Sequence, residues 1–217
     1  SFHQDKQKSN YPSWPVEVMV KLLFGSYLKE KPKLEKGMRV LDVGCGFGNN
    51  LLPFYFKGLE CHGVELTQEI IDVTAKAMSE KGIADVRLEI GHNRKLPYPD
   101  GHFDLLISNN VLHYEQSEEQ ILAGLEEYKR ILKPGGHLFL MTAGPEHDIY
   151  KRAKVVGPHR YMIQNYDFRD GEIYFYFDTL KYLDSYLSKF FTTTELGQVT
   201  EKLMTLSLDF FVAVCKK

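Results

Sequence analysis

The feature that most constrains this chain is the run VLDVGCGFGNN at residues 40–50. A short apolar segment leads directly into Gly44, Gly46 and Gly48, and Asp42 stands two residues before the first of these glycines. Glycines permit backbone conformations and close approaches that other residues disfavour. A strand that ends in such a loop is typical of open α/β sheets, in which ligands bind beyond the carboxyl ends of the strands. Taken alone, the loop suits a dinucleotide, a phosphate or a sulfonium nucleoside.

The hydrophobic pattern predicts strands that alternate with helices along the first two thirds of the chain. The strand segments are almost continuously apolar, which is typical of a parallel sheet covered on both faces. Thr67 and Ser117 have the position of helix N-caps, and Ser117 with Gln120 has the spacing of a capping box. We expect strands at 38–44, 60–66, 85–90, 103–110 and 137–143, and helices at 15–31, 49–58, 67–82 and from 117 to the LKPGG stop at 132–136.

The pattern changes after residue 144, where the chain becomes aromatic and basic. An RDG turn at 169–171 predicts a hairpin between YDF and EIYFYF, and a helix is expected at 179–190. Two final strands, about 191–199 and 204–215, are predicted to join through a polar turn with Thr200, Glu201 and Lys202. So short a connection allows only antiparallel pairing, because a parallel crossover needs a dozen or more residues. The sheet is therefore predicted to be mixed.

Two residues near the glycine loop narrow the choice of ligand. The dinucleotide fingerprint G-x-G-x-x-G requires a glycine at position 49, which is Asn in this chain. Glu65 closes the second predicted strand, where a carboxylate can accept hydrogen bonds from both ribose hydroxyls of a nucleoside. Glu65 alone fits a nicotinamide dinucleotide and S-adenosylmethionine equally well.

Four motifs stand in order over roughly residues 36–143: VLDVGCGFG, GVEL, LPYPDGHFDLLISNNVLHY and LKPGGHLFL. Together they resemble the class I S-adenosylmethionine-dependent methyltransferases, and most closely the ubiquinone and menaquinone biosynthesis (methyltransferase type 11) branch. The resemblance implies an α/β fold, with a Rossmann-like seven-stranded mixed sheet, a C-terminal antiparallel hairpin and helices on both faces. We expect a single methyltransferase domain over 1–217, with an N-terminal lid at 1–16 and an acceptor-binding insert at about 145–178.

The resemblance also implies roles for individual residues. Asp42 complements the ammonium of the methionine part, Glu65 binds the ribose, and Leu66 lies against the adenine. Many relatives carry an acid at the position of His92, so the contact to the adenine amino group passes here to Asn93 or to backbone. The cofactor-binding residues expected on this basis are Asp42, Gly44, Cys45, Gly46, Gly48, Asn49, Glu65, Leu66, His92, Asn93, Asn109 and Asn110.

The expected reaction is methyl transfer from S-adenosylmethionine to a small molecule, with S-adenosylhomocysteine as product and no metal. If the acceptor attacks through a hydroxyl, an imidazole is a suitable general base near neutral pH. The candidates for this catalytic role are His113, His147 and His159. For acceptor binding we expect Tyr11, Trp14, Arg152, Arg160 and Tyr161, which suit an acidic metabolite or sugar; the same basic and aromatic segment is also compatible with a solvated surface over an aromatic core.

The overall composition bears on location and partners. A net charge of −2 gives no support to a nucleic-acid or membrane-surface binder. Three cysteines without CxxC spacing fit a reducing compartment and provide no zinc motif. We therefore expect a cytoplasmic protein without membrane or nucleic-acid partners, as a monomer or homodimer. The alternatives are a catalytically silent methyltransferase-fold scaffold or regulatory partner, an NAD(P)-dependent reductase, and a methyltransferase that acts on protein or nucleic acid.

Overall fold

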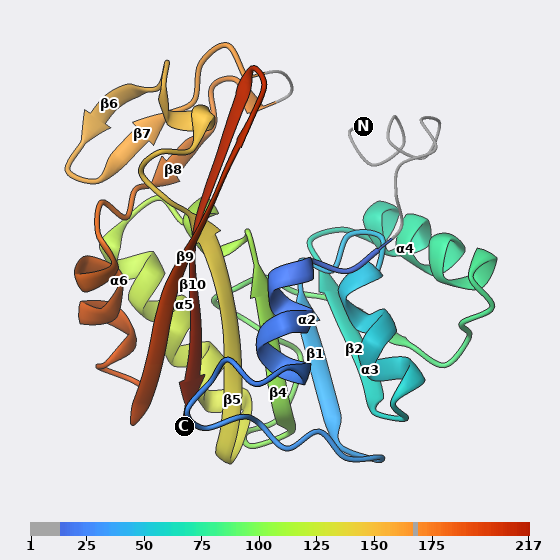
Figure 1. Cartoon of the computed structure of the whole chain (residues 1–217). Helices are drawn as coiled ribbons and strands as arrows, with labels where there is room; N and C mark the ends of the chain where they lie inside the picture. Colours follow the sequence, from blue (N-terminus) through green and yellow to red (C-terminus); the bar gives the residue numbers. More distant parts are fainter. Residues whose placement is uncertain (1–13, 167–168) are drawn as a thin grey trace.

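The computed structural model describes residues 14–166 and 169–217 (Figure 1). Its centre is a seven-stranded sheet in the order β3-β2-β1-β4-β5-β10-β9. The first five strands run parallel, and β10 is antiparallel to both β5 and β9. The sheet strands are β1 Arg39–Val43, β2 Glu60–Glu65, β3 Arg87–Ile90, β4 Phe103–Asn109, β5 Leu132–Ala143, β9 Thr193–Leu203 and β10 Leu206–Lys216.

Helices cover both faces of this sheet, as expected. On one face pack α2 Glu17–Phe24, η1 Asn49–Leu51, α3 Leu52–Phe56 and Met78 of α4 Gln68–Glu80. The other face is covered by α5 Glu118–Ile131 and α6 Leu180–Leu187. Side chains alternate along each strand: Leu105 and Ile107 of β4 enter the first core, whereas Leu106 enters the second. This alternation explains why the strands are apolar along almost their whole length.

The helix signals in the sequence correspond to real caps. The Thr67 side chain accepts a hydrogen bond from the backbone N–H of Ile70, and Ser117 accepts one from Gln120. The side-chain Oε1 of Gln120, however, accepts from the backbone N–H of Gln116 instead of that of Ser117, so the reciprocal half of the capping box is displaced by one residue. The helix expected at 15–31 ends at Phe24, because Gly25 closes it with a hydrogen bond to Lys21 O.

The C-terminal hairpin is present, but its turn is not where the polar residues suggested. Leu203 pairs with Leu206, so the two-residue turn is Met204–Thr205, and the expected turn residues 200–202 lie within β9. Thr200 stays in the strand because its hydroxyl donates to the buried Asp209 on the neighbouring strand. A polar run thus continues a strand when its side chains find partners across the ladder.

A small three-stranded antiparallel sheet projects beside the hairpin tip (Figure 1). It consists of β6 Lys154–Gly157, β7 Arg160–Met162 and β8 Ile173–Phe175, and η3 Asp148–Tyr150 precedes it. The expected hairpin between YDF and EIYFYF is wrong in its pairing, because β8 pairs with β7. Asp167 and Phe168 of the YDF segment lie outside the described residues.

Candidate functional site

The glycine loop follows β1, and β1 is the strand at which the order of strand addition along the sheet reverses. From β1 the chain proceeds outward through β2 and β3, and then returns to β4 on the other side of β1. The loops after β1 and β4 therefore diverge, which creates a crevice beyond the carboxyl ends of these two strands. Asp42, Glu65, Asn109 and Asn110, far apart in the sequence, come from the ends of β1, β2 and β4 that border this crevice.

The glycines of the loop are required by conformation. Gly44, Gly46 and Gly48 have φ values of +68°, +54° and +74°, a region that favours glycine. A Cβ atom at Gly44 would lie 2.4 Å from Cγ1 of Val111, the residue that follows Asn110. The loop after β1 and the loop after β4 thus touch at a position where no side chain fits.

Glu65 holds the centre of the loop from the end of β2. One oxygen of its carboxylate accepts a 2.7 Å hydrogen bond from the backbone N–H of Gly46, and the other accepts a 3.3 Å bond from that of Leu66. Burial raises the pKa of Glu65, while these two backbone donors act in the opposite direction. Leu66 beside it is 64% exposed and presents an apolar surface next to the carboxylate.

Several buried polar atoms around the crevice have no hydrogen-bond partner in the part of the chain that the structure describes. They are both carboxylate oxygens of Asp42 and the Oδ1 atoms of Asn49, Asn109 and Asn110. Burial, followed by the charge of Glu65, raises the pKa of Asp42 well above its usual value; the Asn50 amide opposes this rise without forming a hydrogen bond of good geometry. Unpaired buried polar groups are costly, so a cluster of them marks a place prepared for a polar ligand.

The expected adenine-side residues have different surroundings. The Asn93 amide is fully engaged: its nitrogen donates 3.1 Å hydrogen bonds to Val111 O and to Glu115, and its oxygen accepts from the Tyr128 hydroxyl. His92 is half-buried, and its Nδ1 accepts from the N–H of Arg94 at 3.3 Å. The Nε2 atom of His92 takes no part in the contacts just described, whereas every polar atom of the Asn93 side chain is engaged.

Other site residues escaped the sequence reasoning. The Thr74 hydroxyl of α4 contacts the carbonyl oxygen of Gly46, and Met78 lies where a Cβ at Gly48 would be. In the sequence both residues belong to the apolar stripe of a helix, and nothing there distinguished them from ordinary core positions. Cys45, an expected cofactor residue, is buried beside Gly63 of β2, and burial raises the pKa of its thiol.

The three candidate histidines differ in their hydrogen bonds. In His113 and His147, Nδ1 accepts a backbone N–H, from Ala143 at 3.4 Å and from Ile149 at 3.1 Å. Burial lowers the pKa of both rings, that of His113 to about 3. In the neutral ring the proton then resides on Nε2, which is a donor. In His159, by contrast, Nδ1 lies 3.1 Å from the carbonyl oxygen of Tyr176, and the ring stacks on Tyr182 of α6.

The expected acceptor-binding residues come from several segments of the chain. Tyr11 lies outside the described residues. Trp14 is 70% exposed, and the N–H of Val16, two residues later, donates to the side-chain oxygen of Asn50 in η1. Arg152 is exposed, and Arg160 is half-buried on β7. Tyr161 of β7 lines a cavity.

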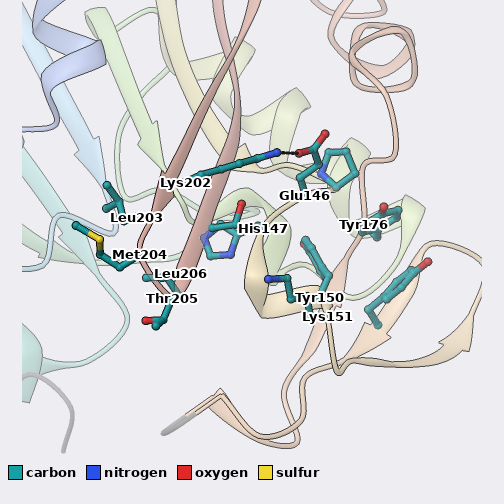
Figure 2. A pocket seen from close by; sticks show the side chains of 13 residues that line it. Glu146, His147, Tyr150, Lys151, Tyr176, Lys202, Leu203, Met204, Thr205 and Leu206 are labelled. Carbon is teal, nitrogen blue, oxygen red and sulfur yellow. Dashed lines mark ion pairs between the residues drawn. The ribbon is translucent and has the colours of Figure 1, made fainter.

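That cavity has a volume of about 640 Å³ and lies between the hairpin tip and the segment after β5 (Figure 2). Glu146, His147, Tyr150 and Lys151 line it on one side together with Tyr161 and Tyr176, and residues 202–207 of the hairpin form the opposite wall. A Lys202–Glu146 ion pair of 3.6 Å crosses it (Figure 2). It is built almost entirely from the segments that follow the fifth strand.

Comparison with known proteins gives matches to methyltransferases. Residues 40–136 match the family model described as a methyltransferase domain. A 103-residue segment is 34% identical to the uncharacterized methyltransferase YcgJ of Bacillus subtilis, covering 48% of this chain and 40% of that protein. A 123-residue segment is 27% identical to the ajmaline N-methyltransferase of Rauvolfia serpentina, covering 56% and 40%. The chain spans about two fifths of the length of these relatives.

Solved structures extend the similarity beyond the matched segment. A SAM-dependent methyltransferase from Methanosarcina mazei superposes with a TM-score of 0.74 at 18% identity, covering 94% of this chain and 98% of that one. The 1,6-didemethyltoxoflavin-N1-methyltransferase of Burkholderia thailandensis, solved with 1,6-didemethyltoxoflavin and S-adenosylhomocysteine, gives a TM-score of 0.64 at 18% identity, covering 84% and 72%.

The seven-stranded sheet and the solved structures show the fold of the class I S-adenosylmethionine-dependent methyltransferases. Residues 40–136, the segment that matches the model of a methyltransferase domain, carry most of the four sequence motifs. The resemblance to this class is confirmed, whereas the ubiquinone and menaquinone branch is not specified by these matches and stays a prediction. Within the described residues, no helix has the length and apolar character needed to cross a bilayer.

Proposed function

We propose that this chain binds S-adenosylmethionine in the crevice at the ends of β1, β2 and β4 and transfers its methyl group to a small-molecule acceptor. The observation that carries the proposal is the set of unpaired buried polar atoms on Asp42, Asn49, Asn109 and Asn110 around the glycine loop. These are groups that a cationic, hydrogen-bonding ligand would satisfy.

The residues present fit the parts of this cofactor. Asp42 would hold the ammonium of the methionine part, and the positive-φ glycines of the loop would let its backbone lie close to the cofactor. Glu65, whose oxygens each keep a further lone pair beyond the two backbone donors, would hold the ribose hydroxyls. The exposed Leu66 would cover one face of the adenine, and Asn109 and Asn110 would border the methyl-bearing sulfur.

The edge of the adenine would be recognised differently here than in relatives that carry an acid at the position of His92. Because Nδ1 of His92 accepts the Arg94 N–H, the neutral ring offers a donor at Nε2. A donor matches a ring nitrogen of adenine, not its amino group. The amino group would then be left to backbone carbonyls or water, since Asn93 is engaged with Val111, Glu115 and Tyr128.

When bound, S-adenosylmethionine supplies a methyl carbon on a positively charged sulfur, and its transfer to an oxygen or nitrogen leaves S-adenosylhomocysteine and releases any proton that the attacking atom carried. The task of the protein is to align the acceptor with that carbon and to exclude water. A small-molecule acceptor is supported by relatives whose names give small molecules as their substrates. Location in the cytoplasm and a monomeric or dimeric state stay predictions.

Calorimetry with S-adenosylmethionine, S-adenosylhomocysteine and NADH tests the cofactor assignment. We expect the first two to bind and NADH not to bind. Glu65→Gln should weaken S-adenosylmethionine binding roughly 10- to 100-fold, because a neutral acceptor replaces a charged one. Glu89→Gln is the matched control, since Glu89 is an exposed acid on the adjacent strand β3.

Two results would overturn this assignment: no S-adenosylmethionine binding to the wild-type chain, or equal affinity in Glu65→Gln. Binding without methyl transfer to any member of a metabolite panel would favour the silent scaffold. Binding of NADH alone would favour the reductase.

A further inference from the structure

The cavity beside the hairpin tip contains a buried hydroxyl with no partner. Tyr150 is 8% exposed, and its phenol oxygen forms no hydrogen bond with any described residue. It lines the cavity together with Tyr161 and Tyr176, with ring centroids 5.7 Å and 4.8 Å from that of Tyr150. Buried tyrosine hydroxyls usually find a partner, so this one marks a position where a ligand atom completes the site.

The aromatic walls define the shape of that ligand. The rings of Tyr161 and Tyr176 lie 4.3 Å apart and are tilted by 31°, and the ring of Tyr150 stands nearly perpendicular to that of Tyr176, at 88°. Across the cavity the hairpin contributes apolar side chains, with Leu203 52% and Leu206 38% exposed (Figure 2). Flat aromatic and aliphatic surfaces facing each other suit a planar ring.

The charged side chains that line the cavity are Lys151, Lys202 and Glu146, and its hydroxyl groups can donate or accept. His147 accepts the N–H of Ile149 through Nδ1, which leaves its proton on Nε2 in the neutral ring. Lys151 and Lys202 each contact one acid, Asp148 at 2.6 Å and Glu146 at 3.6 Å. An ammonium has three N–H donors, so each lysine retains donors for a ligand. The ligand that complements this set carries an acceptor-rich, anionic group.

The two walls of the cavity are held together by a buried acid. Asp209 of β10 is fully buried; one carboxylate oxygen accepts from Gln198 and Thr200 of β9, and the other accepts from the backbone N–H of Glu146. The hairpin and the loop that carries Glu146 and His147 are thereby fixed to each other. A site fixed before its ligand arrives loses less conformational entropy on binding.

We infer that this cavity, defined by Tyr150, His147 and the tyrosine pair Tyr161 and Tyr176, binds an aromatic carboxylate, and that this is the class of the methyl acceptor. The identification as acceptor rests on the proposed function, whereas the binding itself does not. The ring lies between the tyrosines and the hairpin, and the carboxylate accepts from His147 Nε2, the Tyr150 hydroxyl and the lysines.

Titration of the full chain with benzoate as the probe, without cofactor, tests the inference by calorimetry or saturation-transfer NMR. Two matched probes separate charge from shape: benzamide keeps the ring and removes the charge, and cyclohexanecarboxylate keeps the charge and removes the flat ring. We expect benzoate to bind at least roughly tenfold more tightly than either. Equal binding of benzamide or of cyclohexanecarboxylate would overturn the assignment of the ligand class.

Variants locate the binding. Tyr150→Phe removes only the unpaired hydroxyl, and His147→Asn keeps an acceptor for the Ile149 N–H while it removes the Nε2 donor. Each should weaken benzoate binding roughly tenfold with an unchanged melting temperature. Tyr55→Phe is the control, because Tyr55 lines a different cavity beside Glu60 and Arg87. Unchanged benzoate affinity in Tyr150→Phe would overturn the site.

Failure here is distinguishable from failure of the proposed function. S-adenosylmethionine affinity, measured on the same Tyr150→Phe protein, should equal that of the wild type. If S-adenosylmethionine binds and benzoate does not, the acceptor class is wrong and the cofactor site stands. If benzoate binds and S-adenosylmethionine does not, the cavity stands as a binding site and the methyltransferase function fails.

Discussion

The carboxylate of Glu65 accepts a 2.7 Å hydrogen bond from the backbone N–H of Gly46. This contact joins the end of β2 to the middle of the glycine loop after β1, across 19 residues of sequence. It orients the carboxylate before any ligand is present, while burial keeps its pKa raised. The same acid that we assign to the cofactor therefore also shapes the loop that would receive it.

Replacement of Gly44 by alanine should be more damaging than the backbone strain alone predicts. Its φ of +68° is unfavourable for alanine, and the added Cβ would lie 2.4 Å from the stiff, β-branched Val111. We expect a loss of about 2–4 kcal/mol in the free energy of unfolding, measured by urea denaturation. Gly82→Ala is the control, since Gly82 has a φ of +74° with nothing within 4 Å of the added carbon, and it should lose only about 1–2 kcal/mol. Equal losses would show that the Val111 contact relaxes freely.

Asp42→Asn should stabilise the free protein and weaken the binding of S-adenosylmethionine. Burial and the Glu65 charge raise the folded-state pKa of Asp42 well above 3.8. Between these two pKa values the folded protein holds a proton that the unfolded chain releases, so the stability of the wild type falls as pH rises across that window. The asparagine side chain does not titrate, so Asp42→Asn lacks this pH dependence. The difference in melting temperature between the variant and the wild type should therefore increase with pH. Identical pH profiles of melting temperature would contradict the assigned shift.

His113 should make the protein less stable in mild acid. Burial, with smaller contributions from His147 and Arg169, lowers its pKa from 6.5 to about 3. The unfolded chain binds a proton below pH 6.5 that the folded protein does not, so stability is lost as pH falls from 6.5 toward 3, by up to about 1.4 kcal/mol per unit. His113→Gln should show a shallower decline in urea denaturation between pH 6.5 and 4. At pH 7.5 His113 is neutral in both the folded and the unfolded chain. The difference in the free energy of unfolding between wild type and His113→Gln at that pH therefore gives the packing cost alone.

Tyr128→Phe should destabilise the protein by about 1–3 kcal/mol, because it leaves the buried Asn93 oxygen without its donor. The Tyr128 hydroxyl also lies 3.0 Å from that of Ser108 on β4, so one phenol links α5, β4 and the segment after β3. Urea denaturation measures the loss. Tyr27→Phe is the control at a 69% exposed position and should change stability by less than about 0.5 kcal/mol. Equal losses in the two variants would show that the hydrogen bonds of Tyr128 do not contribute to stability.

The order of elements was predictable because local chemistry fixes it. Apolar segments, the caps at Thr67 and Ser117, and the LKPGG stop act over a few residues, and each of them is visible in one stretch of sequence. The stop at Gly25 was missed, and the helix expected at 15–31 ends at Phe24. The sequence was misleading where polar residues could occupy either a turn or a strand. Thr200 was predicted to lie in a turn, but its hydrogen bond to Asp209 on the next strand keeps it in β9.

By itself the sequence determined the strand–glycine loop, the acid at the end of the second strand and the mixed sheet, because these follow from periodicity, backbone conformation and connection length. Only the tertiary structure decided which buried polar atoms remain unpaired, which nitrogen of His113 and of His147 carries the proton, and that Tyr150, His147 and the hairpin tip line one cavity. These properties depend on partners tens of residues away, and a linear pattern does not encode the distance between them.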